Sequence, residues 1–176
     1  MNIVLIGLRG SGKSTVGRGL AARMGREFVD TDDLVEKCLG ASIKETVNKK
    51  GWSFFRAVEK GVVEDVCHGD HLVIAAGGGA VLDPENVRSL KKNGLVIWLK
   101  ADRQVLYDRI NQDPRTMANR PTLTGKGALE ELGEIMAYRE PFYEKAADMQ
   151  LDTTELGAEG VVERILSILE EKMGGS

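Results

Sequence analysis

Short apolar runs recur along the chain, and segments with helical spacing lie between them. The clearest runs are residues 2–6, 72–75 and 95–99, and each is apolar throughout rather than alternating. Such a run is typical of a parallel strand covered on both faces, and residues 2–6 are expected at the centre of the sheet. Residues 27–30 and 149–152 read as two shorter strands. The pattern therefore predicts a three-layer α/β fold with a five-stranded parallel sheet.

The helices between these strands begin and end at recognisable signals. Apolar residues spaced four apart predict a helix after Gly12 that ends at Gly25. A capping box over 42–45 starts a helix that Gly51 interrupts. Asp83–Pro84 opens a later helix, which Gly94 closes. Further helices are expected over 32–39, 53–67, 102–110 and 129–147, with the last one around 161–169.

Residues 111–127 contain two prolines, two glycines and several polar side chains. This segment exceeds the usual connection of about 4–6 residues, so we expect a surface loop that closes as a mobile lid. The length of 176 residues fits one domain over 1–176.

Composition narrows the function further. The 24 basic and 27 acidic residues give a net charge of −3, which argues against nucleic acid as a partner. No apolar run is long enough to cross a membrane, and no signal peptide is visible, so we expect a cytoplasmic protein. Cys38 and Cys67 form no CxxC pair and are expected as small apolar fillers. The lack of an obvious exposed apolar stripe favours a monomer.

A phosphate-binding motif carries the strongest chemical signal. Residues 7–14 read G-L-R-G-S-G-K-S and match G-x-x-x-x-G-K-[ST] between a predicted strand and a predicted helix. Glycines let backbone N–H groups surround a polyphosphate, and the helix N-terminus adds further donors. Lys13 would reach the outer phosphates of ATP, and the Ser14 hydroxyl would be a ligand for Mg²⁺. The candidate ATP-binding residues of this motif are Gly10, Ser11, Gly12, Lys13, Ser14 and Thr15.

Two acids follow the second predicted strand. We expect Asp30 to face the metal, through a water molecule, and Asp32 to face whatever lies beyond the terminal phosphate. The alternative is that one of them only caps the helix over 32–39, because Asp is favoured at N-caps. The two roles are compatible.

Ligands of such folds gather at the carboxyl ends of the strands, where Gly77, Gly78 and Gly79 follow the strand over 72–75. Three successive glycines indicate close backbone approach, which favours a polar ligand over a bare turn. Arg56 and Glu59 are spaced for a pair, which is either part of the site or a surface ion pair. Sequence spacing alone does not bring Arg56 and Arg139 together.

Arginines in the predicted lid have a distinct possible role. Arg120 would stabilise the charge on a transferring phosphoryl group when the lid closes, and Arg115 is a competing candidate.

In combination these motifs resemble the shikimate kinase family over almost the whole chain. The residues that carry the resemblance are the motif over 7–14, Asp30-Thr31-Asp32, Phe55-Arg56 with Glu59, Gly77-Gly78-Gly79, Arg120-Pro121, Tyr138-Arg139, Pro141 and Tyr143. The resemblance implies a P-loop fold like that of nucleoside-monophosphate kinases. It also implies ATP-dependent, Mg²⁺-assisted phosphorylation of the 3-hydroxyl of shikimate, on the way to chorismate and the aromatic amino acids.

The resemblance also assigns roles. Lys13, Asp32 and Arg120 would be catalytic, with Asp32 as the base that holds the acceptor hydroxyl. Arg56 and Arg139 would grip the shikimate carboxylate, and Gly77, Gly78 and Gly79 would contact the ring hydroxyls. Arg109 would stack on adenine, and the helices over about 32–67 would bind the substrate.

The chain departs from the family pattern at a few positions. Trp52 stands where a glutamate is expected, and Ala75 and Ala76 lack the hydroxyl that often precedes the glycines. The pattern assigns no role to Arg9 or Trp52.

Two alternatives remain. One is another small-molecule P-loop kinase, acting for example on gluconate or a nucleoside monophosphate; Asp32 and Arg56 argue against it. The other is a nucleotide-dependent module without catalysis, which would be expected to lose Asp32 or the lid arginine.

Overall fold

Within residues 1–113 and 127–174, which the computed structural model describes, five strands form one parallel sheet. They are β1 (Asn2–Ile6), β2 (Glu27–Asp30), β3 (Leu72–Ala75), β4 (Gly94–Lys100) and β5 (Met149–Asp152). Their order is β2-β3-β1-β4-β5, with every pair parallel. The predicted sheet and the central position of residues 2–6 are confirmed. Most of the predicted lid, with Arg115 and Arg120, lies outside the described residues.

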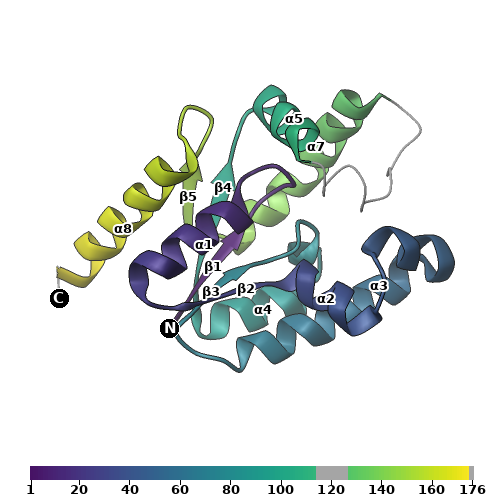
Figure 1. Ribbon diagram of the computed structural model, residues 1–176, viewed down its shortest axis with the longest axis horizontal. Coiled ribbons are helices and arrows are strands. Elements are labelled where there is room, and N and C mark those ends of the chain that lie inside the picture. Colours follow the sequence, from purple (N-terminus) through teal and green to yellow (C-terminus); the bar gives the residue numbers. More distant parts are fainter. Residues whose placement is uncertain (114–126, 175–176) are drawn as a thin grey trace.

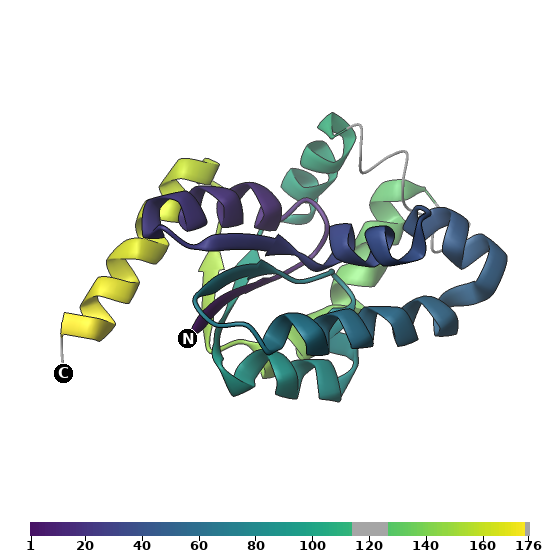
Figure 2. The same ribbon diagram turned by 60° about the horizontal axis from the view of Figure 1, so that its bottom comes forward.

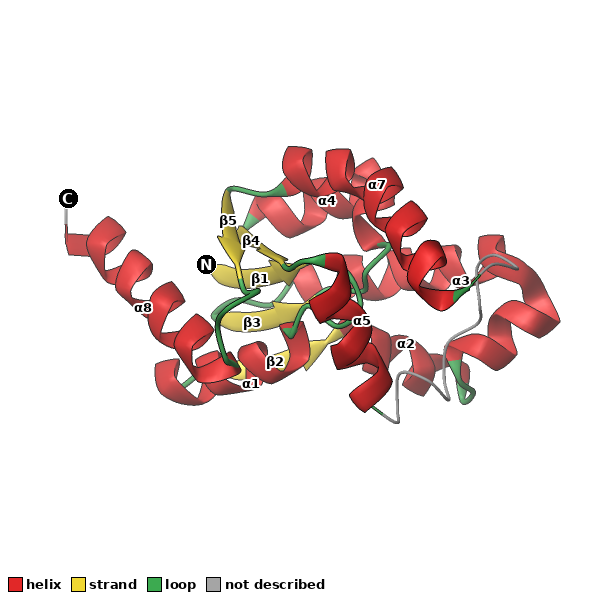
Figure 3. Cartoon of the chain, turned by 90° about the horizontal axis from the view of Figure 1, so that it is seen from above, coloured by secondary structure: helices red, strands yellow, loops and turns green. Residues whose placement is uncertain are grey.

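Helices cover both faces of this sheet and complete the three predicted layers (Figure 1 and Figure 3). On one face lie α1 (Lys13–Met24) and α8 (Ala158–Gly174). On the other lie α3 (Ile43–Cys67), α4 (Pro84–Lys92) and α7 (Ala128–Ala146). The remaining elements are α2 (Thr31–Leu39), α5 (Arg103–Gln112) and a 3₁₀ turn over Ala80–Leu82.

The central strand explains why the core has two halves. Ile3 and Leu5 pack into the cluster under α1 and α8, whereas Val4 and Ile6 point into the cluster under α3, α4 and α7. All four side chains are at most 1% exposed, and each such burial contributes about 1.5–3 kcal/mol to folding. Because β1 is anchored from both sides, the loop that follows it is held at the middle of the sheet's carboxyl edge.

Helices α2 and α3 extend beyond the edge of the sheet and carry a small core of their own (Figure 2). Its buried residues are Val35, Ile43, Phe55 and Val62. The capping box between Ser42 and Glu45 forms as predicted. Gly51 interrupts α3 with a φ of 81° and a ψ of 169°, as the sequence indicated.

Three details of the predicted elements were wrong or incomplete. Helix α2 begins at Thr31, one residue earlier than predicted, and its N-cap is Asp30, one of the two acids that could fill this position. Gly94 does not close a helix: α4 ends at Lys92, and Gly94 begins β4 because its backbone pairs with Asn2 of β1. Asp102 stands at the N-cap of α5, but its side chain makes no capping hydrogen bond.

The cysteines differ from each other. Cys67 is half-buried, and burial raises the pKa of its thiol to about 11, which fits an inert filler. Cys38 is exposed, so its prediction as a buried filler was wrong. Among the helices of the described residues, none has the length and apolar character that crossing a bilayer requires.

Gly94 provides a test of how tightly the core is closed at β4. A Cβ at Gly94 would contact the carbonyl oxygen of Leu90 and lie 2.8 Å from Cγ2 of Val4. Gly94→Ala is therefore expected to lower the free energy of unfolding by about 1–3 kcal/mol. The matched control is Gly61→Ala in α3, where a Cβ meets nothing within 4 Å; it should stabilise by about 0.5–1 kcal/mol. Urea denaturation measures both, and an unchanged or raised stability of Gly94→Ala would contradict the packing described.

Candidate active site

The loop between β1 and α1 is shaped to surround an anion. Gly10 and Gly12 adopt φ values of 81° and 92°, which other residues rarely do. Gly12 is the N-cap of α1 and supplies no side-chain oxygen, and the first turn of α1 contains no acid. The first N–H groups of α1 are thus left for a ligand, and the helix dipole favours a negative one.

Lys13 lies across the mouth of this loop. Its Nζ donates to the carbonyl oxygens of Gly7 and Leu8, each at 2.9 Å. These bonds hold the ammonium close to the loop's N–H groups. The predicted contribution of Lys13, a positive charge beside the outer phosphates, fits this position.

Ser14 and Asp30 meet as the sequence predicted for a metal site. The Ser14 hydroxyl donates to Oδ2 of Asp30 at 2.6 Å, and Oδ1 of Asp30 accepts from the backbone N–H of Asp32 at 3.0 Å. Burial raises the pKa of Asp30, while the bond from Ser14 opposes that shift. A hydroxyl and a carboxylate are hard oxygen donors, so this pair fits Mg²⁺. Asp30 also caps α2, and this cap is compatible with the predicted metal role.

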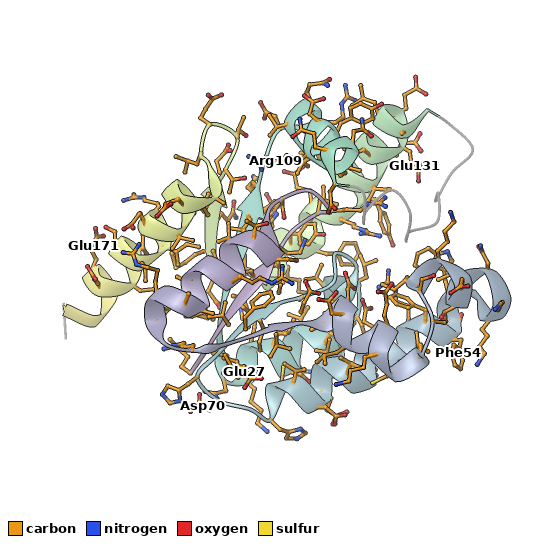
Figure 4. The ribbon with its side chains drawn as sticks, in the orientation of Figure 1. Glu27, Phe54, Asp70, Arg109, Glu131 and Glu171 are labelled. Carbon is orange, nitrogen blue, oxygen red and sulfur yellow. The ribbon has the colours of Figure 1, made fainter. Side chains whose placement is uncertain are left out.

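A cavity of about 600 Å³ opens beside the loop, within the range of about 300–1,000 Å³ for small-molecule sites. The predicted ATP-binding residues Gly10, Ser11, Gly12, Lys13, Ser14, Thr15 and Arg109 all line it. Arg109 lies on the side of α5 that faces the β5–α8 loop (Figure 4). Its Nη2 donates to the Thr153 carbonyl at 2.8 Å, and its Nη1 to the Thr153 hydroxyl at 3.1 Å. We call this cavity the nucleotide pocket.

A second, narrower cavity adjoins the first, and we call it the acceptor pocket. It is lined by Asp32, Arg56, Gly78, Gly79 and Arg139. The fold thus brings Arg56 and Arg139 into one pocket, a proximity that sequence spacing could not predict. The cavity measures about 50 Å³, less than a typical small-molecule site.

Arg56 is held by a buried partner. Its Nη1 donates to Oε2 of Glu59 at 2.5 Å, and the Glu59 side chain is 2% exposed. The alternative of a surface ion pair is excluded by this burial. A buried carboxylate of this kind requires a cationic partner, so Glu59 fixes Arg56 at the pocket.

Two of the three glycines, Gly77 and Gly79, are explained by the side chains around them. A Cβ at Gly77 would lie 2.6 Å from Oδ1 of Asp32 and 2.9 Å from Oε1 of Glu59. A Cβ at Gly79 would overlap the guanidinium of Arg56. The predicted close approach is therefore present, and its partners in this structure are side chains of the site itself.

Sequence reasoning missed several residues that line these pockets. Arg9 and Ile43 line both, so they stand, with the predicted Asp32, where the two pockets meet. Trp52 lines the acceptor pocket, with the Arg56 guanidinium 5.5 Å from its ring centre. Leu132 and Ile135 line the same pocket from α7. Their apolar helical spacing looks like ordinary core, so no local signal distinguishes them.

Known proteins resemble this chain over nearly its whole length. A family model described as shikimate kinase matches residues 9–170. A shikimate kinase of Symbiobacterium thermophilum is 45% identical, with 98% of each chain covered. Shikimate kinase 2 of Yersinia enterocolitica is 41% identical, covering 97% of this chain and 96% of its own. The structure of shikimate kinase from Acinetobacter baumannii in complex with shikimate has a TM-score of 0.90 at 33% identity, with 97% of this chain and 93% of that chain covered.

The contact between Gly79 and Arg56 gives a test of the acceptor pocket. In Gly79→Ala the new methyl group would displace the Arg56 guanidinium, because the far end of that side chain can move and the backbone cannot. Loss of one charged hydrogen-bonding group should raise the KM for the phosphoryl acceptor about tenfold or more. The KM for ATP should stay unchanged, as it should for both substrates in Gly61→Ala. Steady-state kinetics separate these effects, and an unaltered acceptor KM would mean that Arg56 does not contact the acceptor.

Proposed function

The chain belongs to the shikimate kinase family, and on that premise we propose that it transfers the terminal phosphoryl group of ATP to the 3-hydroxyl of shikimate. The products are shikimate 3-phosphate and ADP. The activity serves the shikimate pathway, which leads to chorismate and the aromatic amino acids.

One observation supports this assignment above the others. The acid at the junction of the two pockets, Asp32, shares the acceptor pocket with two guanidinium groups, Arg56 and Arg139. A pair of arginines recognises a carboxylate through parallel, charge-assisted hydrogen bonds. The pocket therefore favours an acceptor that carries both a hydroxyl and a carboxylate, as shikimate does, over a neutral polyol.

At the nucleotide, this chain's own groups bind and neutralise phosphate. The N–H groups of Gly10, Gly12 and the first turn of α1 would surround the phosphates, and Lys13 would add its charge at the outer ones, while the N–H of Ser11 donates to the Leu8 carbonyl. Ser14 and Asp30 would hold Mg²⁺, which neutralises phosphate charge when it is bound. Arg109, joined to Thr153, would hold the adenine end of the pocket.

At the acceptor, Arg56 and Arg139 orient shikimate by its carboxylate, so that the 3-hydroxyl points to the junction. Asp32 then accepts the proton of that hydroxyl as its oxygen attacks the terminal phosphorus. The bond from phosphorus to the bridging oxygen breaks, and ADP leaves in line with the attack. Gly78 and Gly79 line the acceptor pocket and would face the ring hydroxyls, whereas Gly77 is not among the residues that line either pocket.

The catalytic role of Arg120 stays a prediction from the sequence, because this residue lies outside the described residues. By analogy with arginine fingers, a lid arginine on the transferring group would be worth about 10³–10⁵ in rate. The single domain over 1–176, the monomeric state and the cytoplasmic location also remain predictions from the sequence.

A substrate panel tests the function. Purified protein with ATP and Mg²⁺ is expected to release ADP with shikimate and to show no turnover above background with gluconate or AMP. A coupled assay of ADP release measures all three, and the reaction without any acceptor is the control. Comparable turnover on gluconate would favour the other small-molecule kinases, and no turnover on any acceptor would favour a non-catalytic module.

Asp32→Asn separates catalysis from helix capping. The amide keeps the shape of the side chain but cannot take a proton, so kcat should fall by about 10²–10⁴. Since Asp30 is the cap of α2, the melting temperature should change little, and ADP titration should give an unchanged affinity. A near-normal kcat would remove Asp32 from the chemistry.

A further inference from the structure

The carbonyl oxygen of Gly78 receives two hydrogen bonds from one helix. Arg139 donates to it from Nη1 at 3.0 Å, and Tyr143 donates to it from its hydroxyl at 2.5 Å. We propose that Tyr143 is a positioning residue for substrate recognition, because its hydroxyl fixes the Gly78 carbonyl on which Arg139 rests. This inference rests on the proposed role of Arg139 in binding the shikimate carboxylate.

The geometry of α7 supports the pairing. Arg139 and Tyr143 are four residues apart, so they project from the same face of the helix. That face packs toward the loop of Gly77–Gly79, which we call the glycine loop. Arg139 lines the acceptor pocket, whereas Tyr143 lies behind it and is 1% exposed. Tyr143 therefore acts from within the core on a group that faces the substrate.

Packing alone does not account for a tyrosine at this position. The ring belongs to the apolar cluster under α3, α4 and α7 and is stacked on Trp98, with ring centres 5.4 Å apart. A phenylalanine would fill the same space without a polar atom. A hydroxyl in such surroundings costs free energy unless it is hydrogen-bonded. Its bond to the Gly78 carbonyl is thus the feature that distinguishes the tyrosine.

The glycine loop needs such a restraint. Glycine is the residue with the most backbone freedom. Gly77 and Gly79 cannot be replaced by a more restricted residue, because Asp32 and Arg56 leave no space for a Cβ there. At its start the loop is already held, because the N–H of Gly77 donates to the buried Thr31 hydroxyl at 2.9 Å. At Gly78 the restraint comes from α7. Two donors on one carbonyl oxygen occupy both of its lone pairs and fix its direction, and with it the place of Arg139 Nη1.

Tyr143→Phe is the direct test, with Tyr138→Phe as the matched control. Tyr138 is on the same helix but 63% exposed. Removing the Tyr143 hydroxyl is expected to raise the KM for shikimate about 3- to 10-fold, the range for one lost hydrogen bond. The kcat and the KM for ATP should remain within about twofold, and Tyr138→Phe should match the unmodified protein in all three. A general loss of packing would instead change both KM values or kcat together.

A double-mutant cycle tests whether Tyr143 acts through Arg139. Arg139→Ala alone should raise the shikimate KM, and adding Tyr143→Phe should raise it no further, since the two changes are coupled. The inference about Tyr143 would be overturned if Tyr143→Phe raised the shikimate KM by the same factor with and without Arg139→Ala. It would also be overturned if Tyr143→Phe left this KM unchanged while Arg139→Ala raised it. Either result would leave the proposed role of Arg139 intact. An unchanged KM in Arg139→Ala would overturn the proposed role of Arg139 and this inference with it. If Tyr143→Phe unfolds near the assay temperature, shikimate affinity can be compared between the variants by titration in the cold. An unchanged ADP affinity then shows that the variant is folded.

Discussion

The site depends on a stretch of backbone with no space for side chains. The glycine loop runs between Asp32, which follows β2, and Arg56, which comes from α3, so closely that a single Cβ at Gly77 or Gly79 would overlap one of them. Interiors are close-packed and deform little. The loop therefore sets the spacing between Asp32, which lines both pockets, and Arg56, which lines the acceptor pocket. A hydrogen bond that the loop donates to Thr31 of α2, and one that it accepts from Tyr143 of α7, keep the loop itself in place.

Within the described residues, the cationic side chains of the site are hydrogen-bonded to oxygen atoms of the protein itself. Lys13 bonds to two carbonyls of its own loop, Arg56 to Glu59, Arg139 to Gly78 and Arg109 to Thr153. Such bonds hold long, flexible side chains in one geometry before a substrate arrives, which reduces the entropy lost on binding. Anionic substrates then add to these contacts or replace them, because each guanidinium has five donors and an ammonium has three. The strongest such restraint is at Arg56, because its partner Glu59 is a buried carboxylate.

Local signals predicted much of this arrangement because they concern residues that are close in sequence. Apolar runs gave the strands, the motif over 7–14 gave the phosphate loop, and the pair Ser14 and Asp30 met as expected. One error was decided by a distant partner: Gly94 looked like a helix end but begins β4, because Asn2 of β1 pairs with it. Of the two acids that could cap the helix after β2, Asp30 is the cap of α2, and Asp32 lies at the junction of the two pockets.

The sequence by itself determined the fold class and the phosphate loop, since apolar periodicity and motif spacing are properties of neighbouring residues, and its resemblance to a known family implied the type of reaction. Only the tertiary structure decided that Arg56 and Arg139, 83 positions apart in the chain, share one pocket, and that Arg9, Ile43 and Asp32 stand between that pocket and the nucleotide's. It also decided why Gly77 and Gly79 have no space for a side chain and which tyrosine bonds the Gly78 carbonyl. These are distances between elements, and they follow from how the helices pack on the sheet, which no local pattern records.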